Sequence, residues 1–366
     1  MTLRRRLALV LIGLAMLCLA EPAAVRHWRA GALLQSLRAT DGSGLPLVEQ
    51  ELVIRGRAGP IRARLYRRAD APRGPGLVVA HGVHYRGIDE ERLVPFARAL
   101  SRAGLTVLTP ELTDLADYRI TADGVDTIAD SVTYLSRRHD VVTQSRVGVL
   151  GFSFAGGLSL VAAERAELSQ HLAFVASVGG HHDLARVLRF LLSSRVETPR
   201  GVLQGKAHEY GLVVLVYGQL DRLVPAADRD VMRNAMRAWL HGDRDRARAI
   251  ASARTTPEAE QLFSLLEHGK LAALRPRLER LIAEHAVELG ALSSRGHLAH
   301  ATVPIYLLHG ATDDVIPASE TEWAGLELDD KPHLALVSPL LEHVEVAHGA
   351  GVLDQLALVH FMAELL

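Results

Sequence analysis

The chain has 366 residues, of which 49% are hydrophobic, enough to bury a core in one large domain or two smaller ones. Its 41 Lys and Arg residues nearly balance 42 Asp and Glu residues, for a formal net charge of -1. This balance gives no general attraction to polyanions, so we expect no nucleic-acid partner. The single cysteine, Cys18, excludes an intramolecular disulfide and a cysteine-based zinc site.

The N-terminus has the pattern of a signal peptide or a membrane anchor, which we assign to residues 1–25. A basic cluster, Arg4 to Arg6, precedes an apolar stretch over residues 7–20, and Glu21-Pro22 ends it. Such a stretch is short for a full membrane span, although residues 23–25 extend it. We therefore expect an exported protein, either periplasmic or secreted, or held at the membrane by residues 7–25.

Between residues 47 and 183, short apolar strands alternate with amphipathic helices. The first two strands form a hairpin around a Gly-Pro turn. The alternation that follows is typical of an α/β fold: a mostly parallel sheet of about eight strands with helices on both faces. Strands are predicted over 47–55, 61–66, 76–80, 105–108, 147–151 and 174–178, and helices over 90–103 and 122–138.

The alternation breaks at residue 184 and resumes near residue 302. The intervening 184–301 segment is helical in pattern and rich in Arg and Glu, which predicts a large helical cap inserted into the sheet domain. The core domain is therefore predicted to comprise residues 47–183 and 302–366. Its second part should hold strands over 303–308 and 334–337 and helices over 318–326 and 351–366.

The strongest chemical signal is Gly151-Phe-Ser153-Phe-Ala155-Gly156, directly after a predicted strand and before a helix. A serine at such a sharp turn needs small neighbours two residues away, and the turn presents its hydroxyl beyond the sheet. The alternative is a plain turn of a nucleotide-binding fold. That fold places its glycine-rich loop after the first strand, whereas this turn follows about the fifth.

Three further turns follow strands of the same predicted sheet. His81-Gly82-Val83 follows one strand, Asp313 the next to last, and His343 the last. An acid and a histidine at these positions are able to reach the serine, and the order Ser, Asp, His is the one expected for a serine hydrolase. Three alternatives stay open: Asp314, beside Asp313, and Asp221 for the acid, and His348 for the base. The segment from Gly218 to Asp221 repeats the spacing of the acid loop, but we interpret it as a helix break inside the cap.

Together these pieces resemble the α/β-hydrolase superfamily over residues 50–183 and 302–366, with Ala155 in place of the usual glycine. The resemblance implies acyl transfer without a cofactor: Ser153 as nucleophile, His343 as base and Asp313 orienting the imidazole. The backbone amides of Val83 and Phe154 would form the oxyanion hole.

His181, His182 and Asp183 follow another strand, but adjacent histidines point in different directions, so we expect no metal site there. We expect His84, His182 and Phe190 to line the substrate pocket instead. The substrate is predicted to be a small carboxylic ester or lipid-like acyl compound. The alternatives are peptide or amide hydrolysis by the same triad, and a catalytically idle binding protein on the same scaffold.

Overall fold

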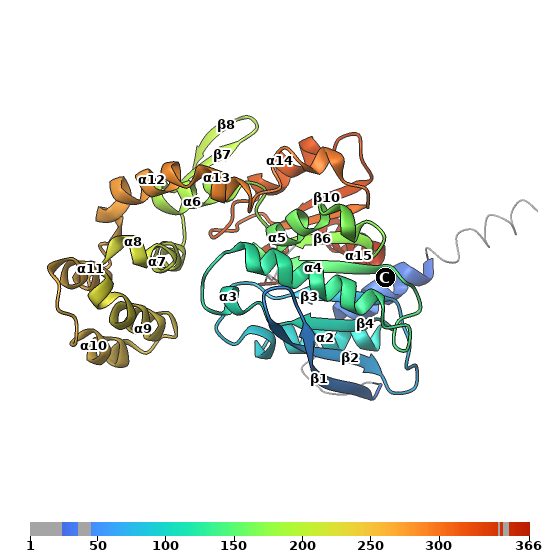
Figure 1. Ribbon diagram of the computed structural model, residues 1–366. Coiled ribbons are helices and arrows are strands. Elements are labelled where there is room, and N and C mark those ends of the chain that lie inside the picture. Colours follow the sequence, from blue (N-terminus) through green and yellow to red (C-terminus); the bar gives the residue numbers. More distant parts are fainter. Residues whose placement is uncertain (1–23, 36–44, 343–344, 347–350) are drawn as a thin grey trace, which may run out of the picture.

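The computed structural model describes residues 24–35, 45–342, 345–346 and 351–366. An eight-stranded sheet forms its centre (Figure 1), in which the second strand in spatial order alone runs in the direction opposite to the others. In spatial order the strands are β1 (Leu47–Arg55), β2 (Pro60–Arg68), β4 (Thr106–Pro110), β3 (Gly76–Ala80), β5 (Val147–Phe152), β6 (Leu172–Val178), β9 (Ile305–Gly310) and β10 (His333–Ser338).

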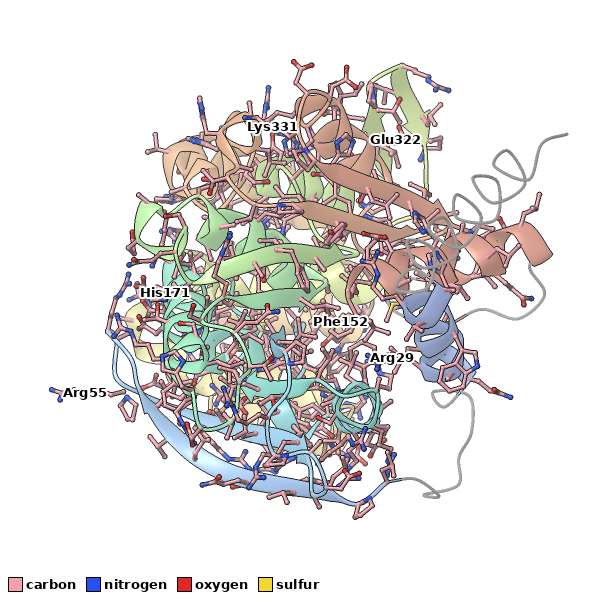
Figure 2. All side chains as sticks on the ribbon, turned by 90° about the vertical axis from the view of Figure 1, so that its right-hand side faces the viewer. Arg29, Arg55, Phe152, His171, Glu322 and Lys331 are labelled. Atoms are coloured by element: carbon pink, nitrogen blue, oxygen red, sulfur yellow. The ribbon has the colours of Figure 1, made fainter. Side chains whose placement is uncertain are left out.

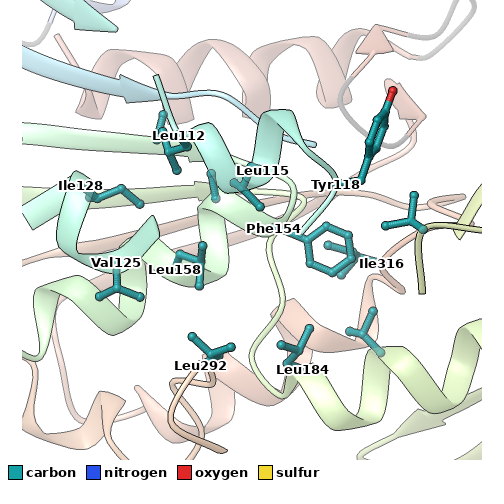
Figure 3. Packing of buried hydrophobic residues seen from close by; sticks show 14 of the residues in the cluster. Leu112, Leu115, Tyr118, Val125, Ile128, Phe154, Leu158, Leu184, Leu292 and Ile316 are labelled. Atoms are coloured by element: carbon teal, nitrogen blue, oxygen red, sulfur yellow. The ribbon is translucent and has the colours of Figure 1, made fainter. Parts of the chain in front are cut away.

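Helices cover both faces of this sheet, so the prediction of an α/β fold with about eight strands is confirmed. One face packs against α4 (Ala122–Ser136), α5 (Phe154–Ala163) and α14 (Ser319–Glu327). Figure 3 shows Leu158 of α5 beside Val125 of α4 in this core. The other face packs against α2 (Leu93–Arg102) and α15 (Val352–Glu364). Because β3 and β4 are covered on both faces, every residue in them is buried.

A mainly helical insertion leaves the sheet after β6 and returns at β9, as the sequence predicts. Its outer helices form a separate lobe beside the sheet (Figure 1). The helices are α6 (Leu184–Ser193), α7 (Glu209–Gly218), α8 (Leu220–Leu223), α9 (Arg229–Leu240), α10 (Arg244–Ala251), α11 (Pro257–Glu267), α12 (Arg275–Glu284) and α13 (Ala286–Gly290).

The insertion also contains a β-hairpin that the sequence pattern does not indicate. Strand β7 (Arg195–Thr198) pairs antiparallel with β8 (Gly201–Gln204). Their side chains are exposed or half-buried, so no apolar alternation marks them as strands. The hairpin rests on α14, where the Trp323 indole N–H donates to the Glu197 carbonyl over 3.3 Å.

The predicted signal or anchor segment, residues 1–25, lies outside the described residues except for Ala24 and Val25. These two residues belong to a helix that the structure describes over 24–35 and that no sequence pattern predicted. Its Ala30 and Leu33 are buried in the same core as α15. In the part of the chain that the structure describes, no helix combines the length and hydropathy needed to cross a membrane.

Candidate active site

Ser153 stands at the turn between β5 and α5 with a backbone conformation unusual for a serine. Its φ of 54° and ψ of -132° are sparsely populated for residues with a Cβ, and such strain is concentrated at functional sites. Two backbone hydrogen bonds hold the turn. The Ser153 N–H donates to the Val178 carbonyl over 2.8 Å, and its carbonyl accepts from the Gly156 N–H over 2.8 Å.

The glycine two residues before Ser153 is required by packing. A Cβ at Gly151 would lie 2.3 Å from the Ala155 carbonyl oxygen and 2.6 Å from the Ser159 hydroxyl. No real Cβ approaches backbone so closely, so only glycine fits between β5 and α5. The position two residues after the serine is less demanding, because the methyl group of Ala155 is accommodated in the buried core.

The loop after β3 lies directly against Ser153. A Cβ at Gly82 would be 3.2 Å from the Ser153 Cβ and 3.3 Å from the Phe152 carbonyl oxygen. Val83 follows and lines the same cavity as Ser153. The neighbouring Phe154 begins α5, a helix of ten residues whose first N–H groups lack partners within the helix. These positions suit the roles predicted for the Val83 and Phe154 amides, which stay predictions.

His81 fixes the path of this loop. Its Nδ1 donates to the Gly82 carbonyl over 2.8 Å, and its Nε2 accepts from the Leu112 N–H over 2.9 Å. Both ring nitrogens are therefore used by one neutral tautomer. Burial lowers the pKa of His81, although Glu111 nearby opposes this effect. The imidazole thus ties the loop to the chain after β4.

Asp313 follows β9 and has a fully buried carboxylate. Its Oδ1 accepts the N–H groups of Val315 and Ile316, each over 2.9 Å, and the His309 Nε2 lies 3.5 Å from its Oδ2. Asp314 is half-buried and lines the cavity, and its carbonyl accepts from the His208 N–H. A buried, oriented carboxylate suits the role predicted for Asp313, and the choice between Asp313 and Asp314 stays a prediction.

The two candidate bases, His343 and His348, lie outside the described residues. Strand β10 ends at Ser338, and two short strands follow, β11 (Leu341–Glu342) and β12 (Glu345–Val346). The assignment of His343 therefore stays a prediction from the sequence.

A cavity of about 2220 Å³ opens at Ser153. On the sheet side it is lined by the loop after β3, including His84, and by Phe154. On the insertion side α6 contributes three leucines spaced along one helix face. These are Leu184, Leu188 and Leu191. The insertion therefore forms part of the cavity wall opposite the serine.

Comparison with known proteins gives no match by sequence and a broad match by structure. The sequence matches no protein-family model and no curated protein. The rice cell wall degrading esterase LipA from Xanthomonas oryzae superposes with a TM-score of 0.52 at 14% identity, over 84% of this chain and 86% of that one. An acylaminoacyl peptidase from Pyrococcus horikoshii superposes with a TM-score of 0.51 at 11% identity, over 87% of this chain and 40% of that one. This chain has the α/β-hydrolase fold. A hyperthermophilic esterase from the archaeon Pyrobaculum calidifontis is also similar, with a TM-score of 0.42 at 16% identity, over 86% of this chain and 80% of that one.

We expected His182 and Phe190 to line the substrate pocket, but neither is among the residues that line the cavity. The His182 Nε2 contacts the Glu327 carboxylate at 2.8 Å, which draws the imidazole toward α14. Phe190 is buried on another side of α6, against Gly205. The helix period explains the difference, because residues 184, 188 and 191 share a face that residue 190 does not. His84 does line the cavity, and partial burial lowers its pKa.

The competing acid, Asp221, lies in the insertion of the α/β-hydrolase fold. It belongs to α8, and its carboxylate accepts from Arg233 over 2.5 Å. The preceding apolar run, which resembles a strand in sequence, is helix α7. Asp221 therefore lies just after a break between two helices of the insertion and does not follow a strand of the sheet.

Sequence reasoning missed Tyr118, which lines the cavity and has a φ of 58°. Its ring lies 6.2 Å from that of Tyr210 and 6.0 Å from that of Tyr217, both on α7 of the insertion. Figure 3 shows Tyr118 beside Phe154. Burial raises the pKa of Tyr210 to about 12, so its hydroxyl is uncharged at neutral pH. No motif marks Tyr118, because the contact joins segments about 90 residues apart.

Proposed function

We propose that the chain is a serine hydrolase that cleaves a small carboxylic ester or lipid-like acyl substrate through an acyl-enzyme. The observation that carries the proposal is the strained Ser153 turn, which faces a large cavity between the loop after β3 and the inserted α6. Such costly backbone conformations are concentrated at active sites and ligand sites. The fully buried carboxylate of Asp313 after β9 supports the same reading.

The proposed reaction has two steps. In the first, Ser153 Oγ attacks the carbonyl carbon while His343 takes the hydroxyl proton, and Asp313 holds the imidazole in the required tautomer. The Val83 and Phe154 amides stabilise the oxyanion. Collapse of the tetrahedral intermediate breaks the bond to the alkoxide, which leaves with the proton from His343. In the second step, water gives its proton to His343 and attacks the acyl-enzyme, releasing the acid and restoring the Ser153 hydroxyl.

The cavity lining supports an apolar acyl group. Leu184, Leu188 and Leu191 of α6 contribute branched aliphatic surface, and Val214 and Leu215 of α7 extend it. Burying an acyl chain against such side chains stabilises the complex by about 0.8 kcal/mol per CH₂ group. Neither a cofactor nor a metal enters the proposed reaction.

We further infer that residues 7–25 direct export or hold the chain at a membrane. The inference rests on the basic cluster and apolar stretch of the sequence alone. It places the hydrolase on the outer side of the cytoplasmic membrane.

Hydrolysis of p-nitrophenyl esters of increasing acyl length tests the proposed function. The wild-type chain should release p-nitrophenolate, and Ser153→Ala should reduce kcat by several orders of magnitude, since loss of a serine nucleophile costs on the order of 10^6. Equal background rates for the two proteins would favour a binding protein. If the ester assignment is right, the wild-type chain should hydrolyse p-nitroanilides with the same acyl groups much more slowly than the p-nitrophenyl esters.

A further inference from the structure

The two helices nearest the chain ends, the helix over 24–35 and α15, lie side by side. His27 contacts His360 through their ring nitrogens at 3.1 Å, and the two rings stack with centroids 5.3 Å apart. Ala30 and Leu33 share a buried cluster with Phe361 of α15. Figure 2 shows the first of these helices, marked by Arg29, against α15 at the edge of the molecule.

On their outer sides, both helices expose large apolar side chains. Trp28 is 74% exposed and Leu353 is 81% exposed, and Val25 and Leu356 are exposed as well. Each helix carries its two residues at a spacing of three, which places them on one face. We call these four side chains the helix-pair surface. Single exposed apolar residues need no explanation, but four on two touching helices mark an interaction site.

We propose that the helix-pair surface docks on a lipid bilayer. Two features of the chain favour this occupant. Tryptophan is enriched at membrane interfaces, and the exposed Arg29 beside Trp28 adds positive charge suited to anionic headgroups. In the sequence, the apolar stretch over residues 7–20 ends only a few residues before the described part of this helix.

The same two helices also line the cavity that contains Ser153. Leu34 of the first helix and Leu358, Phe361 and Met362 of α15 belong to the cavity wall. Phe96 of α2 adds a further apolar side chain there. The bilayer-facing helices thus contribute side chains to the wall of the proposed substrate site. The same helices therefore carry the helix-pair surface and part of the cavity wall. If the proposed function holds, the substrates are esters that partition into the bilayer.

The single cysteine allows a direct test in the full-length chain. In a Cys18→Ser background, Leu356→Cys carries an environment-sensitive nitrobenzoxadiazole label on α15, more than 300 residues from the apolar N-terminal stretch. The labelled protein is added to vesicles of equal parts phosphatidylcholine and phosphatidylglycerol. Fluorescence should rise several-fold and be quenched by spin-labelled lipid. The matched control, Val53→Cys on edge strand β1, is also highly exposed and should show neither change.

Equal behaviour of the two labels on vesicle-bound protein would overturn the proposal. So would a Leu356→Cys signal that rises with protein concentration without vesicles, because that result would indicate a second copy of the chain as the occupant. These readouts do not depend on catalysis. In a separate assay, Trp28→Glu with Leu353→Glu should slow hydrolysis of a vesicle-borne ester severalfold while leaving hydrolysis of a soluble ester unchanged. Failure of the proposed function would abolish both hydrolysis rates and leave the label result intact.

Discussion

Glu320 of α14 and Arg186 of α6 form a buried, two-pronged ion pair that joins the sheet domain to the insertion. The guanidinium Nε lies 2.6 Å from Oε1, and Nη2 lies 3.0 Å from Oε2. Glu320 is 1% exposed and also accepts the backbone N–H groups of His182 and Asp183. The Trp323 ring lies against the guanidinium at 5.1 Å. One carboxylate therefore fixes the start of α6 and, with it, the leucines that line the cavity.

Glu320→Gln should destabilise the protein by about 3–5 kcal/mol, because it leaves Arg186 buried without its counter-charge. Urea denaturation followed by circular dichroism measures the loss. The matched control is Glu322→Gln, which removes an exposed carboxylate from the same helix and should change stability by less than about 0.5 kcal/mol. Similar stabilities for the two variants would contradict the role assigned to this ion pair.

Asp313→Asn should lower kcat for ester hydrolysis on the order of 10^4-fold, because the amide holds the imidazole in the wrong tautomer. Asp314→Asn should have a far smaller effect, since its carboxylate is half-buried and accepts no backbone bond that the structure describes. Steady-state kinetics on a soluble p-nitrophenyl ester distinguish the two. A larger loss in Asp314→Asn would move the acid assignment to that residue.

Leu188→Ala should change the preference between short and long acyl esters, because it removes apolar surface from the cavity wall. A loss of one or two methylene-sized contacts corresponds to about a 10- to 200-fold change in relative kcat/KM. Phe190→Ala is the matched control, since it truncates a buried side chain of the same helix that does not line the cavity. It should lower stability without altering the preference. The reverse pattern would mean that Phe190 is the contact with the acyl chain.

The free energy of unfolding should fall as the pH drops below 6.5. Burial lowers the pKa of His81, His181 and His182 from the ordinary value of 6.5. The unfolded chain therefore binds protons that the folded chain does not, and stability is full above pH 6.5 and lost as the pH falls toward the folded pKa values. Each imidazole contributes a slope of up to about 1.4 kcal/mol per pH unit.

Urea titrations at several pH values between 7.5 and 5 measure this slope. His181→Gln removes one imidazole while keeping an N–H donor for the Leu292 carbonyl, which His181 Nε2 meets at 2.8 Å. The slope should be shallower in this variant. A stability that is independent of pH over this range would contradict the lowered pKa values.

Much of the sheet domain was predictable because its strands are short, apolar and separated by clear turns. Strand β3, for example, has the predicted bounds, since glycine and proline limit it on one side and a His-Gly turn on the other. The turn at Ser153 was predictable for a related reason, as packing permits only glycine at position 151. These signals are local, so one sequence is enough to read them.

The residues that the sequence analysis misplaced depend on contacts between distant segments. The orientation of His182 is set by Glu327, nearly 150 residues later, and the environment of Tyr118 by α7 of the insertion. The strands of the β7 and β8 hairpin are four residues each and have no fully buried side chain, so their pairing leaves no clear pattern in the sequence. For Phe190, the helix period predicts which residues of α6 share a face with it, but only the structure shows which face of α6 meets the cavity.

Covalent labelling with a fluorophosphonate, followed by peptide mapping, tests most directly that Ser153 is an activated nucleophile. We expect one labelled peptide containing Ser153, no label in Ser153→Ala, and unchanged labelling in Ser159→Ala, whose buried hydroxyl donates to the Ala155 carbonyl in the same helix. The absence of labelling in the folded wild-type chain, or its persistence in Ser153→Ala, would contradict the account.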